Sequence, residues 1–88
     1  MRFFTKTLTS GSLSIAISDG AMFVSVQCDS STGSATILGN LPFKGLSPTA
    51  VSLSAGQGVN ISALSPASPL DGITITWVAG SVDVLIGV

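Results

Sequence analysis

The sequence predicts an all-β protein, a small sandwich or barrel of about seven to eight short antiparallel strands joined by hairpins. Apolar and polar residues alternate along most of the chain, whereas the spacing of an amphipathic helix is nearly absent. Turn signals built on Gly, Pro, Asp and Ser recur about every 8–12 residues, as in sandwiches and barrels. A chain of 88 residues is enough for one such domain with a thin core.

The N-terminal residues alternate in the same way. We treat residues 1–88 as a single β domain in which residues 1–9, MRFFTKTLT, form an edge strand or an extended arm. Lys6 and three threonines interrupt the apolar run, which leaves no signal-peptide core of the usual ~7–15 apolar residues. No stretch approaches the ~20 apolar residues of a membrane helix either. We therefore expect synthesis in the cytoplasm and no membrane partner.

Residues 12–28, SLSIAISDGAMFVSVQC, predict the first hairpin. Asp19-Gly20 is a favoured pair for a two-residue type I′ turn. With this turn, one face of the hairpin is apolar and the other is mostly polar, so turn chemistry and alternation select one register. The apolar face pairs Leu13 with Val26, Ile15 with Val24 and Ile17 with Met22.

Two segments in the middle of the chain come next. Residues 36–41, TILGNL, predict a strand after a Ser-rich loop. Residues 50–63 predict a second hairpin around Gly56-Gln57-Gly58, with Gly58 in the left-handed position. The alternative is a short helix that begins at Ser47 and Pro48 and stops at Gly56. Valine and the alternating serines favour the hairpin.

Residues 73–88 predict the third hairpin, with a type II′ turn at Gly80-Ser81. Across the three hairpins, the inward-facing apolar residues give the expected core. These are Leu13, Ile15, Ile17, Val24, Val26, Leu53, Ile61, Ile75, Trp77, Val84 and Ile86. Cys28 lies on the apolar face of the first hairpin and is expected to be a small core residue, because a single cysteine cannot close an intrachain disulfide.

The residue types needed for catalysis are nearly missing. The chain has no His, so neither a Ser–His–Asp nor a Cys–His arrangement can form. Lys6 or Lys44 could pair with a serine, but 15 serines make such a pair a coincidence. Three of the four Asp residues lie at or beside turns, where aspartate usually bonds its own backbone. We therefore expect no enzyme activity and no catalytic, metal or cofactor site, and three scattered cations exclude a basic surface for nucleic acid.

The surface is poor in charge. The chain has a net charge of −1 and carries 15 Ser and 8 Thr, so its copies repel one another weakly. A hydroxyl also costs far less to desolvate than an ammonium group, and such a surface can be covered by a neighbour. On the C-terminal hairpin, the face opposite the Trp77 side chain is only half polar. We predict an interface between copies on the second face or the edge of this hairpin, formed by Thr74, Thr76, Val78, Leu85 and Val88.

A short all-β chain that is rich in Ser, Thr and Gly, is poor in charge and ends in ITITWVAGSVDVLIGV resembles small structural proteins of tailed bacteriophage virions. Head-decoration, head-fibre and tail-tip proteins have this character. The resemblance covers most of the chain in style and carries over no individual functional residue. It implies a homo-oligomer, commonly a trimer, on a capsid or tail surface, with other virion proteins as partners. The implied location is the virion, after synthesis in the host cytoplasm.

A glycan- or receptor-binding β module is the alternative interpretation, with Trp77 or the loops as the site. Trp77 shares its face with Ile73 and Ile75, which favours a position in the core. An exposed indole would instead offer a stacking surface to a sugar or an aromatic ligand. Few aromatic residues accompany it, whereas a carbohydrate-binding module usually exposes several beside polar partners.

Overall fold

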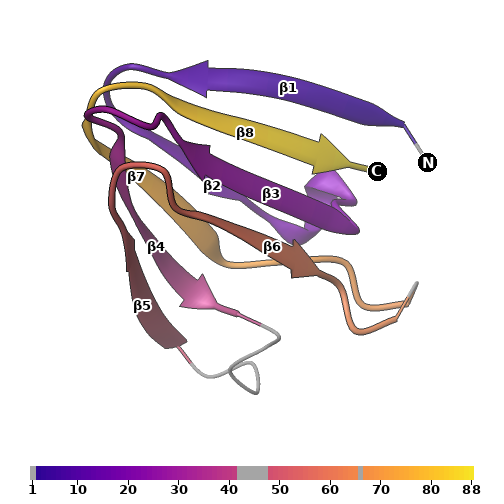
Figure 1. The fold of residues 1–88 in the computed structure, drawn as a ribbon. Helices are drawn as coiled ribbons and strands as arrows, with labels where there is room; N and C mark the ends of the chain where they lie inside the picture. The colour runs from indigo at the N-terminus through magenta and orange to yellow at the C-terminus, as the bar shows by residue number, and fades with distance from the viewer. Residues whose placement is uncertain (1, 42–47, 66) are drawn as a thin grey trace.

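The described residues form eight antiparallel strands in two sheets that face each other as a sandwich (Figure 1). The computed structural model describes residues 2–41, 48–65 and 67–88. The strands are β1 (Phe3–Leu8), β2 (Ser12–Ile15), β3 (Phe23–Cys28), β4 (Ser34–Asn40), β5 (Pro48–Leu53), β6 (Gly58–Ser62), β7 (Ile73–Ala79) and β8 (Val82–Gly87). A single 3₁₀ turn, η1 (Ile17–Asp19), is the only helical element of the described residues. The prediction of a small all-β sandwich is confirmed.

The strand order identifies the arrangement of the sandwich. The first sheet has the order β1-β8-β3-β6, and the second sheet has the order β2-β7-β4-β5. Along the chain, every connection between the described strands crosses from one sheet to the other, except that between β4 and β5. This is the eight-stranded jelly-roll topology, in which two sheets are wound together by repeated crossings.

The three predicted hairpins are wrong in their pairing and right in where the chain turns. β2 pairs with β7 and not with β3, because the two strands around Asp19-Gly20 belong to different sheets. β5 and β6 are likewise separated, and so are β7 and β8. Each turn is therefore an arch that carries the chain from one sheet across to the other. The helix considered for residues 47–56 is also wrong, since Pro48–Leu53 is the strand β5.

An arch and a hairpin place the same residues in the core, which explains the error. In a hairpin, two strands lie side by side and their apolar faces are coplanar. In an arch, the two strands lie in facing sheets about 10 Å apart, and their apolar faces point at each other. Alternation alone cannot separate these cases, because both bury every second residue.

The conformations of two turns also differ from those predicted. The left-handed glycine of the 56–58 turn is Gly56, with a φ of 77°, and not the predicted Gly58, which begins β6. At the first turn, Gly20 takes the left-handed conformation after η1, with a φ of 65°. The alternation stops at this 3₁₀ turn, so the side chain of Ile17 faces solvent with 58% exposure. The prediction of Ile17 as a core residue is wrong.

The core lies between the two sheets and agrees with most of the prediction. Ile15, Val24, Val26, Leu53, Ile61, Ile75 and Val84 are buried as predicted, while Leu13, Trp77 and Ile86 are partly buried against them. Cys28 is also buried, as predicted. The core gains further residues from β4, from strand ends and from connections, namely Leu8, Ala21, Ala35, Ile37, Leu41, Leu70, Ile73 and Val82.

The apolar C-terminal strand is covered by the N-terminal strand. β8 is a central strand, with β1 on one side and β3 on the other. Beyond the strand ends, the N–H of Arg2 donates to the Val88 carbonyl (2.9 Å) and the N–H of Val88 donates to the Arg2 carbonyl (2.8 Å). Residues 3–8 are thus the edge strand expected for the N-terminal segment. The C-terminal residues, by contrast, form no edge.

The two ends of the sandwich differ in content (Figure 1). We call one the arch end, formed by the connections 9–11, 29–33, 54–57 and 80–81. We call the other the terminal end, which holds both termini and the connections 16–22 and 63–72.

Candidate interaction surface

The residues of the predicted interface lie on two sides of the molecule. Thr74, Thr76 and Val78 alternate with the buried residues of β7 and point outward from the second sheet. Leu85 points outward from β8 in the first sheet, which is the opposite face of the sandwich. Val88 follows β8 and bonds Arg2 through its backbone. The five residues therefore do not form one patch, and the edge that we predicted for this hairpin is wrong because β7 and β8 are both paired on both sides.

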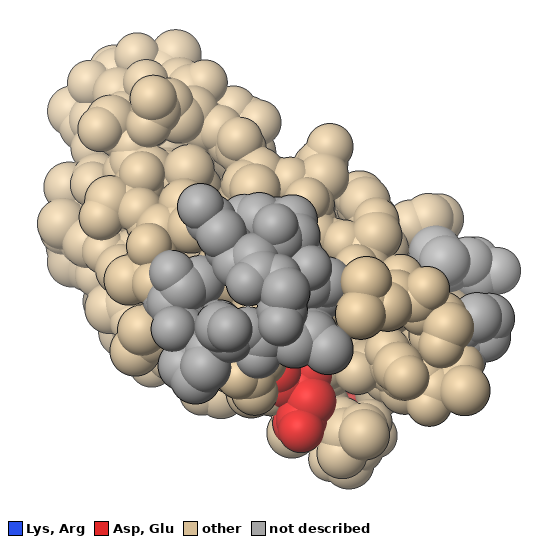
Figure 2. Space-filling model, turned by 90° about the horizontal axis from the view of Figure 1, so that it is seen from below, with Lys and Arg blue, Asp and Glu red and all other residues tan. Residues whose placement is uncertain are grey.

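Both outer faces are poor in charge. On the second sheet, rows of hydroxyl side chains cross the strands, since Ser12 and Thr36 both pair with Thr76 while Ser14 pairs with Thr74. On the first sheet, the Thr7 hydroxyl donates to Asp83 Oδ1 (2.8 Å) and the Ser25 hydroxyl donates to Asn60 Oδ1 (2.7 Å). Seen from below relative to Figure 1, the described residues likewise show a small acidic area and no Lys or Arg (Figure 2).

The exposed apolar side chains gather mainly at the terminal end. Phe3 is 56% exposed, Leu64 is 64% exposed, and Phe4 and Ile17 are similarly open to solvent. Sequence reasoning missed this cluster because the residues come from three separate segments. The signal available in the sequence was the pair of adjacent phenylalanines in a segment that alternates like a strand, where one ring must face away from the core.

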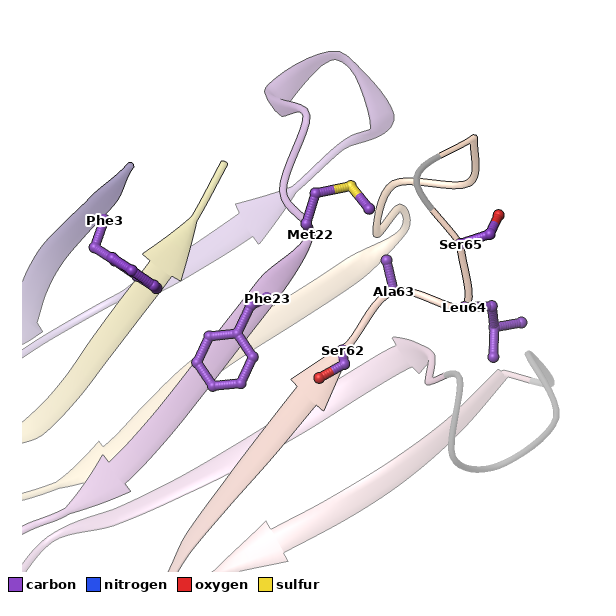
Figure 3. Close-up of a pocket in the computed structure, with 7 residues that line it drawn as sticks. All are labelled: Phe3, Met22, Phe23, Ser62, Ala63, Leu64 and Ser65. Atoms are coloured by element: carbon purple, nitrogen blue, oxygen red, sulfur yellow. The ribbon is translucent and has the colours of Figure 1, made fainter. Parts of the chain in front are cut away.

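Part of this cluster borders a groove of about 440 Å³ (Figure 3). Phe3 comes from β1, Phe23 and the preceding Met22 from β3 and its approach, and the remaining walls from β6 and the residues that follow it. The full lining is Phe3, Met22, Phe23, Ser62, Ala63, Leu64 and Ser65.

Strand register explains the position of the two rings. Phe3 pairs with Gly87, and Gly87 pairs in turn with Phe23, which places the three residues in one row across the first sheet. Glycine has no side chain, so the row carries an aromatic ring on each side of an open centre. The groove offers the Ser62 and Ser65 hydroxyls as its polar side chains and no charged group. Its chemistry suits an apolar surface.

Trp77 is a core anchor, as the sequence favoured. Its side chain is partly buried against the core. The indole Nε1–H donates to the Gly80 carbonyl oxygen at 2.7 Å, at the arch end. This bond satisfies the polar atom of the ring within the chain.

Asp29 organises the arch end. Its Oδ1 accepts hydrogen bonds from the N–H groups of Thr32 (2.7 Å) and Ser31 (2.9 Å), as expected for an aspartate in a turn. Its Oδ2 accepts from the N–H of Ser81 (2.7 Å), which belongs to the arch between β7 and β8. The Asp29 carbonyl accepts from the N–H of Gly56 (2.8 Å), in the arch between β5 and β6. One residue thus ties three arches together.

The same hydrogen bonds set the charge state of Asp29. The N–H donors, Thr32 first and then Ser81 and Ser31, hold the pKa of the Asp29 carboxyl far below its ordinary value. The neighbouring Cys28 behaves in the opposite way, because burial and then the charge of Asp29 raise the pKa of its thiol. A thiol that stays protonated is a poor nucleophile and metal ligand.

The other acidic side chains have local partners. Asp19 Oδ2 accepts from the N–H of Ala16 and Asp71 Oδ1 accepts from the N–H of Ile17, both at 2.8 Å. Within the described residues, no group of three or more Cys, Asp, Glu or His side chains could hold a metal ion. Lys44, considered as a partner for a serine, lies outside the described residues.

The comparisons with known proteins found no relative. No family model matches the chain, and neither the curated proteins nor the solved structures gave a significant match. Among the described residues, no helix has the length and apolar character needed to span a bilayer.

Proposed function

We propose that this protein is a structural subunit of a bacteriophage virion that assembles with copies of itself on a capsid or tail surface. The observation that carries the proposal is the set of exposed apolar side chains at the terminal end, on a domain with few charges to keep copies apart. The partners in this proposal are further copies of the chain and other virion proteins, and its location is the virion.

The topology is compatible with this role. Jelly rolls form viral capsid domains as well as lectin domains, so the fold supports a structural function without selecting it. Hydroxyl-rich outer faces of the kind found on both sheets can be buried against a neighbour at low desolvation cost. The hydrogen bonds of Asp29 meanwhile close the arch end within one copy.

Two measurements test the proposal. Particles of the encoding phage, once purified and dissociated, should yield peptides of this sequence in mass spectrometry. The isolated protein should show a native mass larger than one chain at high concentration. A monodisperse monomer that is also missing from the particles would contradict the proposal.

A matched pair of variants separates the two outer faces. Leu85→Lys places a charge on the first sheet and Val78→Lys places one on the second, on opposite sides of the sandwich. A variant that is folded but released from the particle identifies the face that contacts it. If both variants remain bound as tightly as the wild type, neither outer face is the contact.

One observation favours the alternative of a glycan- or receptor-binding module. Phe3 and Phe23 flank the open centre above Gly87, and sugars stack on such rings. We expect chemical-shift changes at these rings if a glycan binds. Titration with a panel of simple sugars that leaves the resonances of Phe3 and Phe23 unmoved would remove this candidate.

A further inference from the structure

β1 is an edge strand whose outer side is unpaired within the described part of the chain. Arg2 and Val88 exchange two hydrogen bonds, so they form a hydrogen-bonded pair of the antiparallel ladder between β1 and β8. Such pairs alternate with non-bonded pairs along a ladder. The backbone groups of Phe3, Thr5 and Thr7 therefore point away from β8, toward the free edge.

The other sheet edges are shorter or interrupted. β2 has four residues, β6 has five residues and begins with glycine, and β5 begins at Pro48, which has no N–H to donate. Short strands and prolines are the usual means by which proteins block edge pairing. β1 has six residues, and all except Leu8 are exposed. Its one guarding feature is the charge of Lys6.

We infer that two copies of this chain pair through β1, antiparallel, with Thr5 of one copy opposite Thr5 of the second copy. The inference rests on the proposed self-assembly and names the surface for it. Such a contact is isologous and uses each β1 once, so it closes at two copies. A trimer would need a different surface. Both outer faces stay free for other virion proteins.

The hydrogen bonds select this register. Residues directly opposite each other on antiparallel strands have their side chains on the same face of the sheet. In a symmetric pair of copies, one residue of β1 must therefore lie opposite the same residue of the second copy, and this residue is the centre of the pairing. With Thr5 at the centre, Phe3 lies opposite Thr7 of the second copy. Every free N–H and C=O of Phe3, Thr5 and Thr7 then finds a partner. Centring on Phe4 or Lys6 leaves one of these three residues without a partner inside β1.

The charges select the same register. With Lys6 at the centre, the two ammonium groups lie directly opposite each other, and with Phe4 at the centre, Lys6 lies opposite Arg2. Like charges in directly opposed positions are destabilising. With Thr5 at the centre, Lys6 lies opposite the Phe4 ring of the second copy, which is a favourable cation–π pairing. Phe4 already accepts a cation within its own chain, since the Arg2 guanidinium lies 5.4 Å from the ring centre.

A cleft beside β1 supports a contact on this side of the sandwich. Its lining is mostly apolar and also includes Ser14 and Asp19. The cleft has a volume of about 270 Å³. Phe4 of β1, Leu13 of β2, and Ile86 and Val88 at the C-terminal end contribute its apolar walls. A second copy paired on β1 would cover the mouth of this cleft.

The first experiment compares native mass against concentration for the wild type, Thr5→Pro and Thr5→Val. The wild type should approach twice 8.8 kDa. Thr5→Pro removes an N–H that faces away from β8, so the fold should survive while the dissociation constant rises about tenfold or more, because two bonds across the edge are lost. Thr5→Val keeps the N–H and should pair like the wild type. Thermal unfolding checks that each variant is folded.

The second experiment tests the register and does not depend on proline. Thr5→Lys alone and Thr5→Glu alone should each be monomeric, because like charges meet at the centre of the contact. An equimolar mixture of the two should form a mixed pair. Thr7→Lys should still pair with itself, since position 7 lies opposite Phe3.

The outcomes separate this inference from the proposed function. A wild type that stays monomeric at the highest concentration overturns the β1 contact, and it overturns the proposed function as well only if the protein is also missing from purified particles. A wild type that pairs as strongly after Thr5→Pro, or pairs equally in Thr5→Lys alone and in the mixture, overturns the β1 contact and leaves self-assembly through another surface standing.

Discussion

The two ends of the sandwich differ in how their connections are bonded and in how much apolar surface they leave exposed. At the arch end, the carboxylate of Asp29 accepts hydrogen bonds from backbone N–H groups of two arches. The backbone carbonyl of Asp29 accepts one from a third arch, so the connections satisfy one another's backbone hydrogen bonds. At the terminal end, Asp71 Oδ1 accepts from the N–H of Ile17 and the N–H of Leu70 donates to the Ala21 carbonyl, so the connections 63–72 and 16–22 are also tied together. Here, however, the side chains of Phe3, Leu64 and Ile17 face solvent. The contrast teaches that both ends are held together within one copy, while the terminal end also leaves apolar surface that a neighbour can cover.

Replacement of a core residue should have the largest effect on stability. It should destabilise both ends together, because both depend on the shared core. Ile75→Ala removes a fully buried side chain and should lower the free energy of unfolding by about 2–5 kcal/mol. Ile17→Ala is the matched control at the exposed terminal end, where the loss should stay below about 0.5 kcal/mol. Chemical denaturation of both variants measures the difference. Equal losses would contradict the assignment of the core.

Two glycines with the same φ of 65° compare the ends directly. Gly80→Ala should cost about 1–2 kcal/mol for the left-handed backbone alone. Its added Cβ would also lie 2.6 Å from Asp29 Oδ2, so the total loss should be larger. Gly20→Ala meets no atom within 4 Å and should show the backbone cost only. Denaturation midpoints that fall equally in the two variants would show that the arch end is not tightly closed.

Acid should weaken the arch end through Asp29. The pKa of this carboxyl is lowered by folding, so its contribution to stability is complete well above the unfolded-state value of about 3.9 and is lost as the pH falls through that value toward the folded one. The difference in melting temperature between the wild type and Asp29→Asn should therefore be constant near neutral pH and shrink below about pH 4. A difference that is unchanged between pH 7 and pH 3 would rule out this role.

The smallest effect on stability should come from the terminal end. Leu64→Ser replaces an exposed side chain and should change the free energy of unfolding by less than about 0.5 kcal/mol. It should at the same time reduce the binding of an apolar dye, because Leu64 forms part of the groove wall. If the variant loses more than about 1 kcal/mol, Leu64 belongs to the stabilising structure and the contrast between the ends is weaker than described.

The sequence allowed the turns and the inner faces to be predicted, but not the partners of the strands. Ile15, Ile75 and Val84 are buried as the alternation indicated. The pairing of β2 with β7 could not be predicted, because the arch at Asp19-Gly20 buries the same residues that a hairpin would. Surface properties were harder still. Thr74 and Leu85 looked like one face of a hairpin, and the crossing at Gly80 puts them on opposite sides of the molecule.

The position of β8 between β1 and β3 has a consequence for how the chain folds. Phe3 and Gly87 are partners in the ladder although they are separated by nearly the whole sequence. Such a pairing must close a long loop before it gains any contact energy, so refolding should be slow for a domain of this size, in the millisecond-to-second range of β sandwiches. During synthesis, β1 has no partner until the last strand leaves the ribosome. A nascent chain that stalls before Val82 lacks β8, so β1 and β3 have no central strand between them.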